Sequence, residues 1–210
     1  MQYVLHLDAY LAQLVQQLGP WAYAAIFATI FAETGLVVAP FLPGESLLLT
    51  SGALAGADIL TIAVLAPLMF AAAWLGDVCN YLIGRFVGRH LLSKPRRYLR
   101  PEHVEQAHEF YERHGGMAIV FARFLPVVRT LAPFVAGVAR MEIHRLMFFA
   151  AVASALWVTI FLGAGYWFGT VQWVQDYLAV ALAGIVLASL VPGVVVYIVH
   201  RLRRKKTAQR

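Results

Sequence analysis

Apolar residues form long runs along the chain, and prolines, glycines and a few charged residues interrupt these runs. Three runs, residues 59–83, 146–168 and 178–199, are long enough for transmembrane helices, which need about 20 apolar residues. Hydrophobic residues make up 61% of the chain and charged residues only 13%, which argues against an ordinary soluble domain. The pattern therefore predicts an all-α polytopic membrane protein.

Two further apolar segments, residues 21–57 and 117–141, are broken by proline. Proline removes a backbone hydrogen bond and clashes with the preceding turn, so a helix tends to stop there. The pieces on either side are too short to cross a bilayer alone, so each segment is expected to be a re-entrant helical hairpin. For residues 21–38 a full span is the alternative. The interrupting prolines are Pro40, Pro43, Pro126 and Pro133.

The seventeen Lys and Arg residues predict the orientation of the chain in the membrane. None precedes Arg85, and most of them fall in two clusters, at residues 85–100 and 201–210. Basic segments beside apolar spans face the cytoplasm and its anionic lipid. Two spans separate the basic tail from the second hairpin, so that hairpin is expected to begin and end on the cytoplasmic side. The first hairpin is expected to open to the exterior.

The two predicted hairpins therefore have opposite orientations. The segment A-P-F-L-P-G at residues 39–44 is echoed by A-P-F-V-A-G at residues 132–137. A repeat with opposite sidedness predicts an inverted-repeat architecture, in which broken helices meet near the middle of the bilayer, as in many secondary transporters. The predicted domains are an amphipathic interfacial helix over residues 1–18, a membrane domain over residues 19–200 and a basic cytoplasmic tail over residues 201–210.

Ionisable residues at membrane depth are the candidate functional groups. Arg123 and Arg129 lie six residues apart in an apolar segment without an acid, where each arginine costs about 3 kcal/mol or more on insertion scales. Glu33 and Glu45 lie in the first hairpin, and Asp77 lies in the span that follows it. One interpretation is an anion site formed by the arginines. The other is that the charges reach the headgroups, or form buried ion pairs that only hold the hairpins together.

Other patterns give little sign of metal or nucleic-acid chemistry. His103, His108 and His114 are five and six residues apart, unlike the i, i+4 spacing of a helical metal pair, so no metal or cofactor is expected. No Ser-His-Asp set or cluster of histidine and carboxylate residues is evident at membrane depth, so an enzyme such as a lipid phosphatase is the weaker alternative. Anionic lipid explains the basic clusters without nucleic acid.

Two smaller groups of residues carry structural expectations. Asp77 and Asn80 are three residues apart on one face of a predicted helix, and we expect them to hydrogen-bond inside the bundle. Trp157, Trp167 and Trp173 are expected to be anchors at the membrane interface.

Several motifs together resemble the DedA family of bacterial inner-membrane proteins, over about residues 3–200. They are F-A-E-T-G at Glu33, F-L-P-G-E-S at Glu45, G-D-x-x-N-Y-x-x-G-R at Asp77, Y-x-x-H-G-G at Tyr111, and F-x-R-F-x-P-x-x-R-x-x-x-P-x-x-A-G from Phe121. Where many family members have Asp in the P-G-[DE]-S motif, this chain has Glu45. The charge is kept and the side chain is one methylene longer.

The resemblance implies two opposed re-entrant hairpins and a role in moving lipids across the inner membrane, with dependence on the proton motive force. The implied cargo is undecaprenyl phosphate, recycled as a carrier lipid. Phosphatidylethanolamine, general phospholipid translocation and proton-coupled ion antiport are alternatives. By motif, the functional acids of the family correspond to Glu33 and Glu45, and its arginines correspond to Arg123 and Arg129. Whether one chain or a homo-oligomer is the working unit is left open.

These residues suggest a mechanism. We expect Arg123 and Arg129 to bind the phosphate of a lipid whose tail stays in the bilayer, because guanidinium groups match phosphate oxygens bidentately. Glu33 and Glu45 would balance the charge of the empty site, with Asp77 as a third candidate. Protonating one of these acids would favour the loaded state and couple transport to protons.

Overall fold

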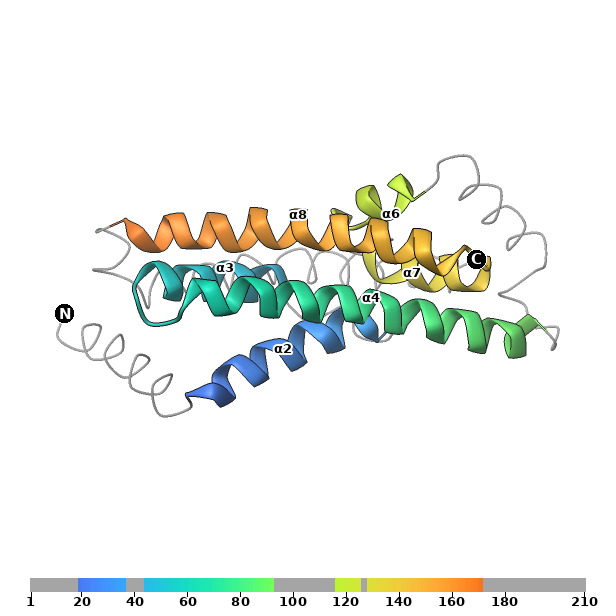
Figure 1. Ribbon diagram of the computed structural model, residues 1–210, viewed down its shortest axis with the longest axis horizontal. Helices are drawn as coiled ribbons and strands as arrows, with labels where there is room; N and C mark the ends of the chain where they lie inside the picture. The colour runs from blue at the N-terminus through green and yellow to red at the C-terminus, as the bar shows by residue number, and fades with distance from the viewer. Residues whose placement is uncertain (1–18, 37–43, 93–115, 126–127, 172–210) are drawn as a thin grey trace, which may run out of the picture. The chain divides into compact units, whose positions relative to one another are not determined.

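The computed structural model describes residues 19–36, 44–92, 116–125 and 128–171. All of them are helical or lie in short connections. The helices are α2 (Pro20–Gly35), α3 (Gly44–Gly56), α4 (Ile62–Leu92), α6 (Met117–Ala122), α7 (Val128–Val138) and α8 (Ile143–Thr170) (Figure 1). This part of the chain contains no strand, which confirms the predicted all-α class. The predictions for residues 1–18, 178–199 and 201–210 and for the three histidines lie outside the described residues.

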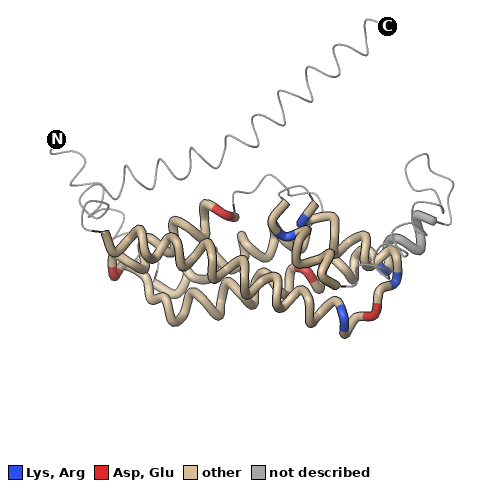
Figure 2. Tube along the Cα trace, turned by 90° about the horizontal axis from the view of Figure 1, so that it is seen from above, with Lys and Arg blue, Asp and Glu red and all other residues tan. Residues whose placement is uncertain are grey.

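Two described helices are long and apolar enough to cross a membrane. They are Ile62–Phe86 of α4, with 25 residues, and the whole of α8, with 28 residues. They lie at two of the three predicted spans, 59–83 and 146–168, and both continue past the predicted ends. Figure 2 shows few Lys, Arg, Asp or Glu positions along these helices, as a hydrocarbon environment requires.

The two proline-containing segments each form a pair of helices with an interruption between them. In the first segment α2 ends at Gly35 and α3 begins at Gly44. In the second segment α6 ends at Ala122 and α7 begins at Val128. The helix, break and helix pattern predicted for both segments is therefore observed.

The prediction that Pro133 breaks the second segment was wrong, because Pro133 lies inside α7. A proline within a helix has no N–H to donate to the carbonyl four residues before it, here that of Arg129. The same turn is held from outside the helix, because the side-chain amide of Asn80 on α4 donates a hydrogen bond of 2.7 Å to the carbonyl of Thr130. The interruption falls instead between Ala122 and Val128.

The chain divides into two compact units, which are described separately. In the first unit α3 packs against the last part of α8, residues 161–170. Gly52 on α3 and Gly165 on α8 each lie so close to the facing backbone that a Cβ atom would overlap it. Small residues of this kind let helices in membranes approach until their backbones touch.

The second unit contains α2, most of α4, α6, α7 and α8 up to residue 160. Tyr81, Ala136 and Leu146 form part of its core and are fully buried. The hydroxyl of Tyr81 donates a hydrogen bond of 2.5 Å to the carbonyl of Met141 and accepts one of 2.8 Å from Arg85. The bond to Met141 fixes α4 to the connection between α7 and α8.

The contact between α4 and α7 depends on a missing side chain at Gly137. A Cβ atom there would overlap the carbonyl of Tyr81 and the backbone nitrogen of Arg85. We therefore expect Gly137→Ala to lower the free energy of unfolding by about 1–3 kcal/mol, the usual cost of overpacking. Reversible unfolding in mixed micelles measures this change.

Gly163→Ala is the matched control for this substitution. Gly163 is also helical, but no atom lies within 4 Å of the position that its Cβ would take. Alanine there is expected to be neutral or slightly stabilising, because it favours a helix more than glycine does. Equal destabilisation by the two alanines would contradict the close contact between α4 and α7.

Candidate functional site

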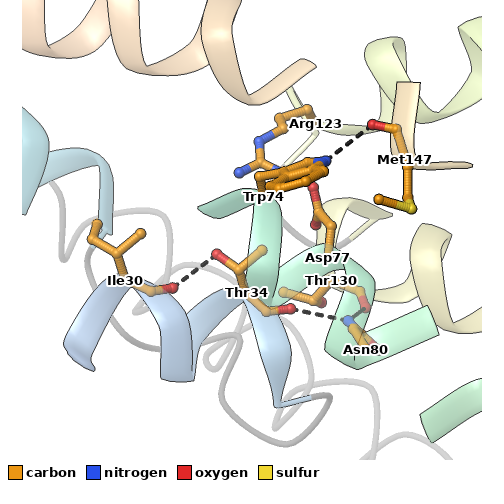
Figure 3. Close-up of polar contacts among 8 residues, drawn as sticks. All are labelled: Ile30, Thr34, Trp74, Asp77, Asn80, Arg123, Thr130 and Met147. Carbon is orange, nitrogen blue, oxygen red and sulfur yellow. Dashed lines mark hydrogen bonds and ion pairs between the residues drawn. The ribbon is translucent and has the colours of Figure 1, made fainter. Parts of the chain in front are cut away.

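Four charged side chains are buried in the second unit and form two ion pairs. Arg123, directly after α6, pairs with Asp77 of α4, and Arg129, in the first turn of α7, pairs with Glu33 of α2. The exposed fractions are 5% for Arg123, 10% for Arg129, 1% for Asp77 and 2% for Glu33. Figure 3 shows the carboxylate of Asp77 beside the guanidinium group of Arg123. Pairing makes burial of these four charges tolerable, because an unpaired charge at this depth would be very unfavourable.

The interruption between α6 and α7 places the two arginines. Arg123 is the C-cap of α6, and its backbone N–H donates to the carbonyl of Ile119 at 3.2 Å. Arg129 follows the interruption, and its N–H donates to the carbonyl of Leu125 at 2.9 Å. A continuous helix would turn residues six apart toward different directions, whereas the break lets both side chains enter one site.

The indole ring of Trp157 on α8 lies against both guanidinium groups. The Cζ atoms of Arg123 and Arg129 are 5.0 Å and 5.5 Å from the centre of this ring. At these distances the ring attracts both cations, most strongly where water is excluded. The Trp157 ring therefore helps to hold the two positively charged side chains close together.

The prediction that Trp157 is an interface anchor was wrong, because only 2% of Trp157 is exposed. It belongs to an inward face of α8 that also carries Ala150, Ala153 and Leu146, all fully buried. Trp167 is 67% exposed, as an anchor should be. Trp173 lies outside the described residues.

Asn80 holds the backbone beside the second ion pair. Its side-chain amide donates hydrogen bonds to the carbonyls of Thr34, at 3.0 Å, and Thr130, at 2.7 Å (Figure 3). These two residues directly follow Glu33 and Arg129 in the sequence. Asn80 therefore fixes α2 and α7 to α4 where the Glu33–Arg129 pair forms. The prediction that Asp77 and Asn80 bond inside the bundle is confirmed.

A small cavity lies between the arginines and Trp157. Thr34 and Thr130 complete its lining, and its volume is about 10 Å³. This is close to the space that a single water molecule needs. In this arrangement the arginine side chains donate hydrogen bonds to the carboxylates of Asp77 and Glu33.

Four of the five predicted site residues are thus brought together: Glu33, Asp77, Arg123 and Arg129. Glu45 lies half-buried in the first turn of α3, in the other compact unit. Within the described ranges no three His, Cys, Asp or Glu side chains are grouped so that they could hold a metal ion.

Trp157 was missed as a site residue. Its spacing from Leu146, Ala150 and Ala153 along one helical face was the available signal.

The comparisons with known proteins agree with this description. The VTT domain matches residues 42–167. The chain is 44% identical over 212 residues to Protein DedA of Escherichia coli strain K12, which covers 100% of this chain and 97% of that protein. It is 39% identical over 183 residues to an uncharacterized membrane protein of Mycobacterium tuberculosis. This match covers 85% of this chain and 80% of that protein. No solved structure matches the chain.

A further relative is inner membrane protein YghB of Salmonella typhimurium, which is 35% identical over 187 residues and covers 87% of this chain and 85% of that protein. The helices and the named relatives together define an all-helical membrane protein. The chain belongs to the DedA family, whose shared region is the VTT domain. The family resemblance expected from the motifs is confirmed.

Proposed function

We propose that the protein is a transporter that moves a phosphate-bearing lipid across the bacterial inner membrane, with undecaprenyl phosphate as the first candidate. The observation that supports this most is the pair of buried arginines on one tryptophan ring, each already facing a carboxylate. A planar guanidinium group binds the oxygens of a carboxylate and of a phosphate in similar geometry. The carboxylates then hold the place of the phosphate in the empty protein.

The small size of the cavity gives this proposal a structural consequence. A space of about 10 Å³ is too small for a phosphate group, which is several times larger than one water molecule. Loading therefore requires at least one carboxylate to move away from its arginine.

Charge balance connects loading to protons. The two arginines and two carboxylates of the ion pairs have no net charge together, so an added phosphate leaves surplus negative charge away from water. Protonation of one carboxylate removes part of this surplus. Proton binding and phosphate binding then favour each other, which lets the proton motive force drive transport.

The proposal includes an arrangement in the membrane. We place residues 21–57 and 117–141 as re-entrant hairpins that open to opposite sides, as inverted repeats, with several spans and a cytoplasmic C-terminus. The lengths of α6 and α7, six and 11 residues, support this for the second segment, because neither can cross a bilayer alone. The lipid leaves chemically unchanged, so we propose that the protein is not an enzyme.

Transport in liposomes tests the proposal. We expect the reconstituted protein to move labelled undecaprenyl phosphate, and Arg123→Ala and Arg129→Ala each to slow this at least about 10-fold, since charged hydrogen bonds contribute about 1.5–3 kcal/mol. Arg145→Ala is the control. Arg145 forms an exposed ion pair with Glu142, and such pairs contribute little, so this variant should transport normally.

Three further measurements in the same liposomes separate the alternatives. Faster movement of labelled phosphatidylethanolamine than of undecaprenyl phosphate would favour a general phospholipid transporter. Release of inorganic phosphate would indicate a phosphatase. Ion flux in the absence of lipid phosphate would indicate an antiporter. Unchanged undecaprenyl phosphate transport by both arginine variants would contradict the proposed site.

A further inference from the structure

Three buried polar atoms beside the Arg123–Asp77 pair have no hydrogen-bond partner among the described residues. They are Oδ1 of Asp77, Oδ1 of Asn80 and Nε of Arg123. Asp77 and Asn80 are at most 1% exposed and Arg123 is 5% exposed, so water does not replace the missing partners freely. Buried polar atoms are nearly always paired, so three unpaired atoms at one place require an explanation.

Asp77 and Asn80 present two acceptors on one face of α4. The residues are three apart in a helix, which makes their side chains neighbours. The orientation of the Asn80 amide is fixed, because its nitrogen donates to the carbonyls of Thr34 and Thr130. Both oxygens can only accept, whereas a protonated Asp77 would add a donor on the same face of α4 as the oxygen of Asn80.

Arg123 offers more donors than Asp77 uses. Its Nη1 atom pairs with Oδ2 of Asp77, while its Nε–H has no acceptor in the part of the chain that the structure describes. The Nε atom and an Nη atom form one edge of the guanidinium group, which can bind two phosphate oxygens side by side. A phosphate on this edge would satisfy a donor that the carboxylate leaves unpaired.

We propose that Asp77 is the acid that releases Arg123 when the lipid phosphate binds and that carries the coupled proton. This rests on the proposed function and specifies how its site works. The phosphate takes the donors of Arg123, and Oδ1 of Asp77 takes a proton from water and donates it in a hydrogen bond to Oδ1 of Asn80. One O–H bond forms on loading, and the proton returns to water when the phosphate leaves.

The other groups around Asp77 are compatible with this exchange. From α7, Arg129 stays paired with Glu33 of α2, and it adds a second positive charge near the phosphate. Residues 146–160 of α8 contain no charged side chain. Trp157 of α8 keeps the Arg123 guanidinium group in place when Asp77 is released. On α4 itself, Arg85 bonds to Tyr81.

Proton uptake on binding tests the assignment. The probe is farnesyl phosphate with the full-length protein in detergent, measured by calorimetry in buffers of different ionisation enthalpy at about pH 8, where the phosphate is fully ionised. We expect the parent protein to take up about one proton per phosphate, with affinity falling about 10-fold per pH unit. Asp77→Asn should take up none and lose that pH dependence, and Asp77→Glu should restore uptake.

Glu142→Gln is the control variant, because Glu142 is exposed, pairs with the exposed Arg145 and should leave the proton uptake unchanged. Full uptake by Asp77→Asn would overturn the assignment. A parent protein that does not bind farnesyl phosphate would overturn the proposed function itself, which is a different result.

A measurement on the parent protein avoids any dependence on the folding of variants. Infrared difference spectra should show the carbonyl band of a protonated carboxyl group when farnesyl phosphate binds. Isotopic labelling of aspartate should shift this band, and labelling of glutamate should not. A band that responds to glutamate labelling, or no band on binding, would overturn the role of Asp77.

Discussion

Replacing Glu33 and Arg129 together by leucine is expected to slow transport of the lipid phosphate strongly while the protein remains folded. Removing Arg129 alone leaves the Glu33 carboxylate buried without its guanidinium partner, which should cost about 3–5 kcal/mol of stability. Removing both charges replaces the buried pair by apolar surface, which is often neutral or stabilising. Transport should still fall at least about 10-fold, because a charged contact to the phosphate is lost.

The double variant therefore separates a structural ion pair from a phosphate site. Unfolding in mixed micelles and transport in liposomes are measured on Arg129→Leu, Glu33→Leu and the double variant. A reciprocal exchange, Glu33→Arg with Arg129→Glu, is the second control, because it keeps the opposite charges but moves the guanidinium group to α2. Transport close to the parent rate in either double variant would show that the charges only hold the helices together.

The sequence was most informative about local features. The apolar runs predicted the two long helices, and the prolines predicted that both remaining segments would be interrupted. The cost of an arginine at membrane depth indicated Arg123 and Arg129 as site residues before any partner was known. These inferences depend on composition and on spacing along a single helix, which a sequence displays directly.

The pairing of the charges could not be predicted in the same way. Arg129 is 96 positions from Glu33, and Arg123 is 46 positions from Asp77. Which acid meets which arginine depends on how α2, α4 and α7 pack. The motifs gave Glu33 and Glu45 the main role, whereas the second unit pairs Arg123 with Asp77, which had been considered third.

Two errors have the same physical origin. Pro133 was expected to end a helix, but the turn before it is held from another helix, where Asn80 donates to the carbonyl of Thr130. Trp157 was expected at the membrane interface, but the inward face of α8 places it against two cations. In both cases a tertiary contact overrides the usual preference of the residue type.

Contact between the lipid phosphate and both arginines is the second large expected effect. Because Arg123 and Arg129 share the face of Trp157, one phosphate group should accept hydrogen bonds from both guanidinium groups. Lysine keeps the charge but not the fork of donors, so each of Arg123→Lys and Arg129→Lys should weaken binding about 10-fold or more. Arg145→Lys should bind as the parent does.

The dipolar coupling between the lipid phosphorus and arginine side-chain nitrogens tests this contact most directly. It is measured by solid-state NMR on nitrogen-labelled protein in bilayers that contain undecaprenyl phosphate. We predict strong coupling in the parent protein, about half of it in each single lysine variant, and none in the double variant. Full coupling in the double variant, or no coupling in the parent protein, would contradict a phosphate site at Arg123 and Arg129.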